Sequence, residues 1–456
     1  MASLQWLKEC SKPTLLVVTI FLAVVLKFLM QEKLKRRKLN LPPGPAKLPV
    51  IGNLHQLAKH LFHGCTDIAF APYGAYWRNI RKICILELLS AKRVHWNNFV
   101  REEEVARLIR RIAESYPGTT NLSKMIGLYA NGVLCRVALG RDFSGGGEYD
   151  RHGFQKMLDD YQALLGGFSL GDYFPSMEFV HSLTGMKSKL VHFRRFDQFF
   201  DEVITEHRNS KGKQEEKKDL VDILLDIQKD GLLKFLSPWI TLKLSSWSVK
   251  ILLDMFAAGT DTTFIILDWA MTELIMNPNA MEKAQDEVRG VVGDRKVVQE
   301  SDLPRLNYMK AVIKEIFRLH PPSPVLLPRE SLEDVIIDGY NIPAKTRIYV
   351  NVWGMGRDPE LWENPETFEP ERFIGSGIDF KGQDFELIPF GAGRRSCPAI
   401  TFGTAAIEIA LAQLLHSFDW KLPPGLEAMD VDNTEAFGIS MHRTVPLHVV
   451  AKPHFD

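Results

Sequence analysis

Residues 389–399 read PFGAGRRSCPA, the most informative stretch of the 456-residue sequence. Glycine and proline mark it as an irregular turn, and residues 401–418, which follow it, have the apolar spacing of a helix. Cys397 therefore lies just before a helix N-terminus. Backbone N–H groups and the positive end of a helix lower the pKa of a thiol, and glycines let such donors approach the sulfur. This setting favours a thiolate.

A single cysteine is more often a small buried apolar residue, so it is the surrounding glycines and arginines that favour a ligand role. A thiolate suits redox-active iron. One cysteine without a second soft ligand nearby excludes an iron–sulfur cluster, which needs about four. Heme iron with an axial thiolate is the option that is left.

The segment resembles the heme-ligand loop of cytochrome P-450 monooxygenases of the plant microsomal type. That family has Phe, Gly, Arg and Cys where this chain has Phe390, Gly393, Arg395 and Cys397. The family usually has a second Gly where this chain has Ala399, a change that is tolerated unless the backbone there needs a positive φ. The resemblance implies a cytochrome P-450 fold, mainly α with small β-sheets, that binds heme b through Cys397.

Composition excludes several classes of protein. Lys and Arg (56) balance Asp and Glu (56), so no net positive field favours a nucleic-acid partner. The five cysteines are an odd number without a C-x-x-C pair, which argues against a disulfide framework and a zinc ribbon and favours a reducing compartment.

The N-terminus predicts a membrane anchor. Residues 14–30 (TLLVVTIFLAVVLKFLM) contain one charge, Lys27, and a basic flank follows at residues 33–38. A buried core helix is the alternative, but the basic flank favours a single-pass helix in membrane lipid with the remaining chain in the cytosol. The resemblance implies the endoplasmic reticulum membrane.

We expect three regions. Residues 1–40 form the anchor and its basic flank, and residues 41–53, which contain LPPGP, form a stiff Pro-rich hinge. Residues 54–456 form the monooxygenase domain. Within it, apolar spacing predicts helices at residues 77–90, 191–207, 219–229, 246–276, 309–320 and 401–418. Short β-prone stretches lie at residues 335–337, 347–352 and 447–451.

The long predicted helix contains AGTDTT at residues 258–263, where a glycine costs about 1 kcal/mol relative to alanine. Threonine hydroxyls can bond the carbonyl four residues back and bend a helix, so a packing kink is one interpretation. The resemblance implies instead an oxygen-binding groove. In it Thr262 steadies dioxygen and Asp261 relays protons, and these two are the expected catalytic residues.

Trp77 and Arg81 stand four residues apart on one helical face, which suits a shared contact with a heme propionate. A surface arginine beside a core tryptophan is the alternative. The resemblance favours the heme role and adds Arg395 and Arg329 as further propionate partners.

Glu315 and Arg318 are three residues apart on a predicted helix, a spacing that most often decorates a solvated surface. The resemblance implies that they form a buried structural triad with Arg372, without a catalytic role.

Matching to the family also gives six residues that face the substrate, nearly all apolar: Phe256, Ala257, Val325, Leu326, Phe437 and Ile439. A lipophilic substrate is therefore expected, of the kind that plant relatives oxidise: a terpenoid, a phenolic or an alkaloid. The chain has no G-x-G-x-x-G dinucleotide motif, so NADPH is expected to act indirectly, through a flavoprotein reductase that supplies electrons for O2.

One region departs from the family. Only residues 58–65 (AKHLFHGC) stand where family members carry several tens of residues, including two strands and part of a substrate-facing loop. The loss is expected to leave a sheet edge exposed. Two alternatives follow: a shortened, non-catalytic heme-binding membrane protein, and a reductase-independent heme-thiolate isomerase or dehydratase. The retained Asp261 and Thr262 speak against the second.

Overall fold

The computed structural model describes residues 67–142, 186–209, 217–229, 244–436 and 438–455. The predicted anchor, the Pro-rich hinge, residues 58–65 and Phe437 lie outside these residues. The chain divides into two compact units, a larger one that includes Val350–Asp456 and a smaller one whose described part is Pro328–Tyr349. Each is described by itself.

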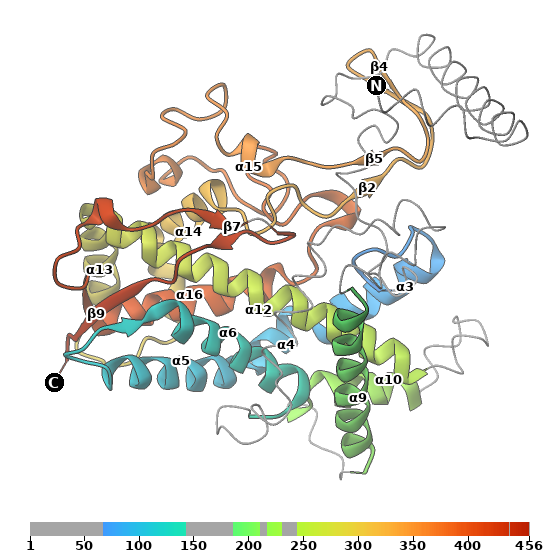
Figure 1. Cartoon of the computed structure of the whole chain (residues 1–456), viewed down its shortest axis with the longest axis horizontal. Helices are drawn as coiled ribbons and strands as arrows, with labels where there is room; N and C mark the ends of the chain where they lie inside the picture. Colours follow the sequence, from blue (N-terminus) through green and yellow to red (C-terminus); the bar gives the residue numbers. More distant parts are fainter. Residues whose placement is uncertain (1–66, 143–185, 210–216, 230–243, 437, 456) are drawn as a thin grey trace, which may run out of the picture. The chain divides into compact units, whose positions relative to one another are not determined.

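The larger unit is mainly helical (Figure 1). Its α-helices are α3 (Ala75–Ile83), α4 (Ala91–Trp96), α5 (Asn98–Ala113), α6 (Leu122–Leu139), α9 (Met186–Asn209), α10 (Leu220–Lys229), α12 (Leu244–Met276), α13 (Pro278–Val292), α14 (Asn307–Leu319), α15 (Val352–Met355) and α16 (Ile400–Ser417). Shorter helical turns are η2 (Cys84–Leu88), η6 (Leu303–Arg305), η7 (Pro370–Phe373), η8 (Gly393–Arg395) and η9 (Ala428–Asp430). All six predicted helices are present; the one expected at residues 77–90 is divided between α3 and the π-helical turn η2.

The strands of the larger unit form a three-stranded antiparallel sheet and a hairpin. In the sheet, β9 (His448–Pro453) lies between β1 (Thr120–Asn121) and β6 (Phe418–Lys421). The hairpin consists of β7 (Glu435–Ala436) and β8 (His442–Arg443). The strand expected at residues 447–451 is therefore present as β9.

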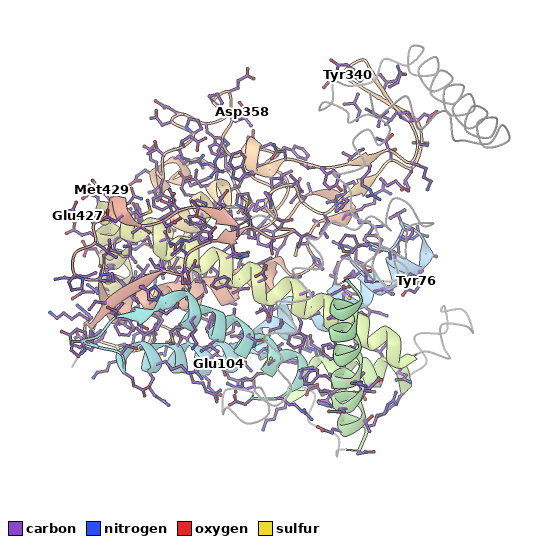
Figure 2. The ribbon with its side chains drawn as sticks, viewed as in Figure 1. Tyr76, Glu104, Tyr340, Asp358, Glu427 and Met429 are labelled. Carbon is purple, nitrogen blue, oxygen red and sulfur yellow. The ribbon has the colours of Figure 1, made fainter. Side chains whose placement is uncertain are left out.

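The described part of the smaller unit contains two antiparallel pairs. β2 (Arg329–Glu330) pairs with β5 (Arg347–Ile348), and β3 (Val335–Ile337) pairs with β4 (Tyr340–Ile342), whose first residue is labelled in Figure 2. Asp338 and Gly339 join β3 to β4 with φ of 49° and 77°, as a tight hairpin turn requires. The strand expected at residues 347–352 is shorter than predicted, because β5 ends at Ile348 and α15 begins at Val352.

Helix α12 runs through the larger unit beside α6 (Figure 1). Its second half is buried on all sides, as at Ile265, Leu267 and Trp269. Gly259 allows α6 to approach closely: a Cβ at this position would lie 3.2 Å from a methyl group of Leu134. The glycine in the AGTDTT motif therefore has a packing role as well as any role in a groove.

Helix α16 is long and apolar enough to cross a membrane, and it alone among the described helices meets that criterion. Two-thirds of it is nevertheless buried within the protein, with Leu411, Ala412 and Leu415 fully enclosed. It is a core helix that places the residues before it, including Cys397, at a fixed position.

Helices α5 and α6 are connected by Glu104, labelled in Figure 2. This buried carboxylate accepts hydrogen bonds from Arg107 at 2.9 Å and from Arg136 at 3.0 Å. Two guanidinium groups compensate its burial, as a buried charge requires.

Glu315, Arg318 and Arg372 meet in the interior. Arg318 donates to both oxygens of Glu315, at 2.7 and 2.8 Å, and Arg372 donates to Glu315 Oε1 at 3.1 Å. Glu315 and Arg318 have no exposed side-chain area. This is the arrangement expected for a structural triad, and it differs from the solvated pair that the spacing alone suggests.

The triad also fixes the segment between Gly356 and Thr367, which passes beside it. Arg318 donates to the carbonyl oxygens of Pro365 at 2.6 Å, Thr367 at 3.0 Å and Gly356. Gly356 lies so close to α14 that a Cβ there would overlap the carbonyl oxygen of Arg318. The absence of a side chain at Gly356 is therefore a condition for this packing.

We expect Gly356→Ala to lower the free energy of unfolding by about 1–3 kcal/mol or more, because the added methyl group must displace backbone. Gly290→Ala is the matched control: Gly290 lies exposed in α13 with nothing near its Cβ position, and alanine favours a helix. Thermal and chemical denaturation of both variants measures the difference. Equal stability of the two would contradict the packing role of Gly356.

Candidate functional site

Cys397 lies in a turn between η8 and α16, and a backbone hydrogen bond from Cys397 closes this turn. Its N–H donates to the carbonyl oxygen of Phe390 at 2.8 Å, and the N–H of Ala399 points at Cys397 Sγ at 3.4 Å. Gly391 and Gly393 each adopt a φ of 68°, which favours glycine. The turn therefore presents a backbone donor to the sulfur, as the sequence predicted.

Ala399, the departure from the family pattern, fits this turn. Its φ is −104°, so the backbone does not need glycine there. The methyl group leaves the N–H of Ala399 directed at the sulfur.

Burial raises the pKa of the Cys397 thiol, whereas the Ala399 N–H and the positive charge of Arg81 lower it. The net shift is upward. The N–H and the cation favour the thiolate, as expected, but without a metal the desolvation of the sulfur outweighs them. A metal that binds the sulfur replaces the proton and supplies the missing stabilisation.

The other two described cysteines are less suited to bind a metal. Cys84 and Cys135 are 2% and 1% exposed, and burial raises the pKa of Cys84 to about 12. Cys397 is only partly buried. Among these three cysteines it is the one that is not fully buried.

Trp77 gathers two arginines beside this turn. Its ring lies 4.0 Å from the guanidinium carbon of Arg395 and 5.4 Å from that of Arg81. The indole N–H donates to the carbonyl oxygen of Ile68 at 2.9 Å, so Trp77 offers its ring face to both cations. The structure thus places Trp77, Arg81 and Arg395 together.

The two guanidinium groups also contact neutral carbonyl oxygens. Arg81 donates to Ser396 O and Arg395 to Ala71 O, each at 2.6 Å. Positive charge is therefore concentrated next to Cys397, while Gly393 leaves open space where a side chain would stand. A thiol, two cations and an open turn fit a cofactor that combines iron with carboxylate groups, as heme does.

Asp261 and Thr262 lie in the middle of α12. Thr262 Oγ1 donates to the carbonyl oxygen of Ala258 at 2.6 Å, the helix-bending bond that its residue type allows. Asp261 Oδ2 accepts a hydrogen bond from the hydroxyl of Ser440. Ala258 is exposed, and Ala257, Gly259, Asp261 and Thr262 beside it are only partly buried, so this face of α12 is open at its centre.

The residues expected to face a substrate differ in how far they are exposed. Phe256 is fully buried and its ring packs against Phe200 of α9, which favours a core role over the predicted substrate-facing role. Val325 is 39% exposed, and Ala257 and Ile439 are partly exposed.

Leu326 has a φ of 52°, a conformation that a leucine adopts only under constraint. It packs with Val352 and Ile388 in a small apolar cluster and is almost buried. Strain of this kind concentrates at functional sites.

Phe390 and Arg329 are the remaining predicted site residues among those described. Phe390 packs edge-on against Phe317 of α14, with ring centroids 5.1 Å apart, so it connects the Cys397 turn to the core. Arg329 is in β2 of the smaller unit, opposite Ile348.

Ser440 is a site residue that the sequence analysis missed. It lies 179 positions from Asp261, and no local motif marks it. Only the pairing of the β7–β8 hairpin with α12 brings it to the site.

Comparison with known proteins agrees with this geometry. A family model described as "Cytochrome P450" matches residues 57–448. Cytochrome P450 71AP13 of Prunus mume is 62% identical over an alignment of 513 positions, which covers 100% of this chain and 98% of that protein. Phenylacetaldehyde oxime monooxygenase CYP71AN24, also of Prunus mume, is 40% identical, with 96% of this chain and 94% of that protein covered.

A solved structure of a zebra fish cytochrome P450 with progesterone superimposes with a TM-score of 0.73 at 24% identity. The match covers 91% of this chain and 89% of that one. This structural match shows the fold. The predicted mainly helical P-450 fold with small sheets is therefore confirmed.

We expect Cys397→Ser to abolish the red-shifted Soret band of the reduced, carbon-monoxide-treated protein, because serine supplies no thiolate to iron. Cys135→Ser is the matched control, since Cys135 is buried and contacts Asn131 through a bond that serine can also make. The absorption spectra of both variants show whether Cys397 binds the heme iron. An unchanged spectrum in Cys397→Ser would show that another residue binds the iron.

Proposed function

Because this chain belongs to the cytochrome P450 family, we propose that it oxidises a lipophilic small molecule of plant specialised metabolism, such as a terpenoid, a phenolic compound or an alkaloid. It is a heme-thiolate monooxygenase that receives electrons from NADPH through a reductase. In balanced form, R–H, O2, NADPH and H+ give R–OH, H2O and NADP+.

The family match over residues 57–448 carries this proposal. The chemistry supplied by bound heme is reductive activation of O2 and transfer of one oxygen atom. Cys397 would hold the heme iron through its sulfur, at which the Ala399 N–H is directed. Arg81 and Arg395, held on the ring of Trp77, would neutralise the propionates.

Asp261 and Thr262 of α12 would deliver protons. Thr262 carries a hydroxyl at the open centre of α12, and the neighbouring Asp261 is the acid that can exchange protons. Loss of either side chain would remove one of the two groups that position a proton for the reaction with O2.

The substrate is proposed from the apolar character of the predicted substrate-facing residues and from relatives in plant metabolism. One relative is named for an aldoxime substrate, which indicates that similar chains act on small organic molecules. Spectral titration with a panel of terpenoids, phenolics and alkaloids, followed by mass spectrometry of products formed with reductase and NADPH, tests the class. A response confined to hydrophilic compounds would contradict it.

The reductase is proposed to dock beside the Cys397 turn. Arg78 and Lys82 of α3 and Arg394 of η8 are exposed there, and the bond from Arg81 to Ser396 holds the two elements together. Such a basic patch attracts an acidic partner. Anchoring in the endoplasmic reticulum membrane by residues 14–30, with this surface in the cytosol, is part of the same proposal.

The non-catalytic alternative and the isomerase or dehydratase alternative are not favoured. Relatives that match nearly the whole chain include a named monooxygenase. The alignment with the Prunus mume P450 extends over 513 positions against 456 residues here, which supports a chain that is shorter than that relative by several tens of residues.

We expect Thr262→Ala to retain heme but to release more hydrogen peroxide per NADPH oxidised, because a hydroxyl that positions O2 and a proton is lost. Thr262→Ser, which keeps the hydroxyl, should resemble the parent protein. Peroxide and NADPH are measured together in a system reconstituted with reductase. Equal peroxide yield in Thr262→Ala would remove Thr262 from the mechanism.

We expect Lys82→Glu to weaken binding of the reductase and so to raise the reductase concentration needed for half-maximal NADPH oxidation. The difference from the parent protein should be smaller at high salt, because salt screens the charges. Lys421→Glu, an exposed charge reversal on β6, is the control. If both variants respond alike, the docking surface lies elsewhere.

A further inference from the structure

The β7–β8 hairpin is fixed to α12 at its base by a histidine between two carboxylates. His320 Nε2 lies 2.8 Å from Glu273 Oε1 of α12, and its Nδ1 lies 3.4 Å from Glu435 Oε1 of β7. The His320 ring stacks on Trp269 of α12 at 3.7 Å with an interplanar angle of 5°. This stack holds the imidazole between the two carboxylates.

A second contact holds the other strand of the hairpin. Arg443 of β8 has its Nη1 3.7 Å from Asp268 Oδ2 of α12, and both side chains are only 2% exposed. Arg443 also donates to the carbonyl oxygen of Asp432 at 2.6 Å. The pair is thus enclosed and limits sliding of the hairpin along α12.

The tip of the hairpin is tightly constrained as well. Gly438 is required because a Cβ there would lie 2.6 Å from the carbonyl oxygen of Ser440. The Met441 N–H donates to Pro322 O at 2.9 Å, and Ser323 Oγ is 3.5 Å from Ile439 O. The residue at the end of this constrained turn, Ser440, donates its hydroxyl hydrogen to Asp261.

Asp261 and Asp268 of α12 therefore contact the hairpin directly, and Glu273 is linked to it through His320. Two of these contacts fix the hairpin, and the third lies at the catalytic face. The hydroxyl of Thr262 donates within the helix to Ala258, whereas the hydroxyl of Ser440 reaches Asp261 from outside α12.

We propose that Ser440 is a positioning residue for proton delivery, which holds the carboxyl group of Asp261 in one orientation throughout its protonation cycle. A hydroxyl can donate to an ionised carboxylate and accept from a protonated one, so the same contact persists in both states. The inference rests on the proposed role of Asp261. It assigns to the hairpin tip a part of catalysis that the α12 motif does not contain.

The stoichiometry of oxygen reduction gives a test that needs no known substrate. With reductase and NADPH, misplaced proton delivery yields H2O2 (O2, NADPH and H+ give H2O2 and NADP+). Productive delivery yields water instead (O2, two NADPH and two H+ give two H2O and two NADP+). In Ser440→Ala we expect the peroxide fraction to rise and the rate of water formation to fall roughly tenfold, as for loss of a hydrogen bond to a charged group.

Two comparisons separate positioning from folding. Ser440→Thr keeps the hydroxyl and should restore both the peroxide fraction and the solvent deuterium isotope effect, which should be larger in Ser440→Ala than in the parent. Thr434→Ala removes an exposed hydroxyl just before β7 that donates to Asp432 at 2.6 Å, and it should leave both quantities unchanged.

A second readout does not depend on activity. Melting temperatures of Ser440→Ala, Asp261→Asn and the double variant, all with heme bound, form a double-mutant cycle. We expect the double variant to melt close to Ser440→Ala, because the two groups act on each other. Additive shifts would overturn the contact and with it the proposal.

Failure of the inference differs from failure of the proposed function. If Asp261→Asn raises the peroxide fraction while Ser440→Ala does not, Asp261 delivers protons without help from the hairpin and the inference is wrong. If Asp261→Asn leaves the peroxide fraction unchanged, the role of Asp261 itself is wrong. If Ser440→Ala raises it and Ser440→Thr restores it, the inference is supported.

Discussion

The site depends on one constraint, which is that α12 must remain buried on most sides while it carries polar groups at its centre. Helices α6, α14 and α16 and the β8 strand all pack on it. Burial of Ile265, Leu267 and Trp269 stabilises the helix by apolar contact, and Gly259 allows α6 to come close. The open face near Ala258 and Thr262 is therefore supported by packing on either side of it.

Buried charge sets the positions of the segments around α12. Glu315 and Arg318 are enclosed, and removing one partner of such a pair typically costs about 3–5 kcal/mol, because the other charge is left without compensation. Their additional bonds to backbone carbonyls fix the chain between Gly356 and Thr367. Polar contacts also hold the β7–β8 hairpin to α12: Arg443 lies beside Asp268, and His320 lies between Glu273 and Glu435.

The Cys397 turn combines two opposed electrostatic effects. Burial disfavours the thiolate, while an N–H and Arg81 favour it, and the pKa of the thiol ends above its ordinary value. A closed site is needed to exclude water from oxygen chemistry, and the ligand then depends on the metal itself for its ionisation. The two arginines held on Trp77 supply positive charge for the anionic edge of the cofactor at the same location.

The sequence by itself determined the helices with regular apolar spacing, the Cys397 turn and the family to which the chain belongs, because these are recorded in short stretches of neighbouring residues. It also identified the members of the Glu315 triad and the arginines beside Cys397, although only as parts of a family pattern. It placed Phe256 toward a substrate, whereas packing against Phe200 of α9 encloses it. It did not identify Ser440, since a hydroxyl donor 179 residues from its acceptor leaves no periodic or local signal. Which side chains meet, and how far burial moves the pKa of Cys397, was decided by the tertiary structure, because desolvation and long-range hydrogen bonds depend on distances in space and not on positions along the chain.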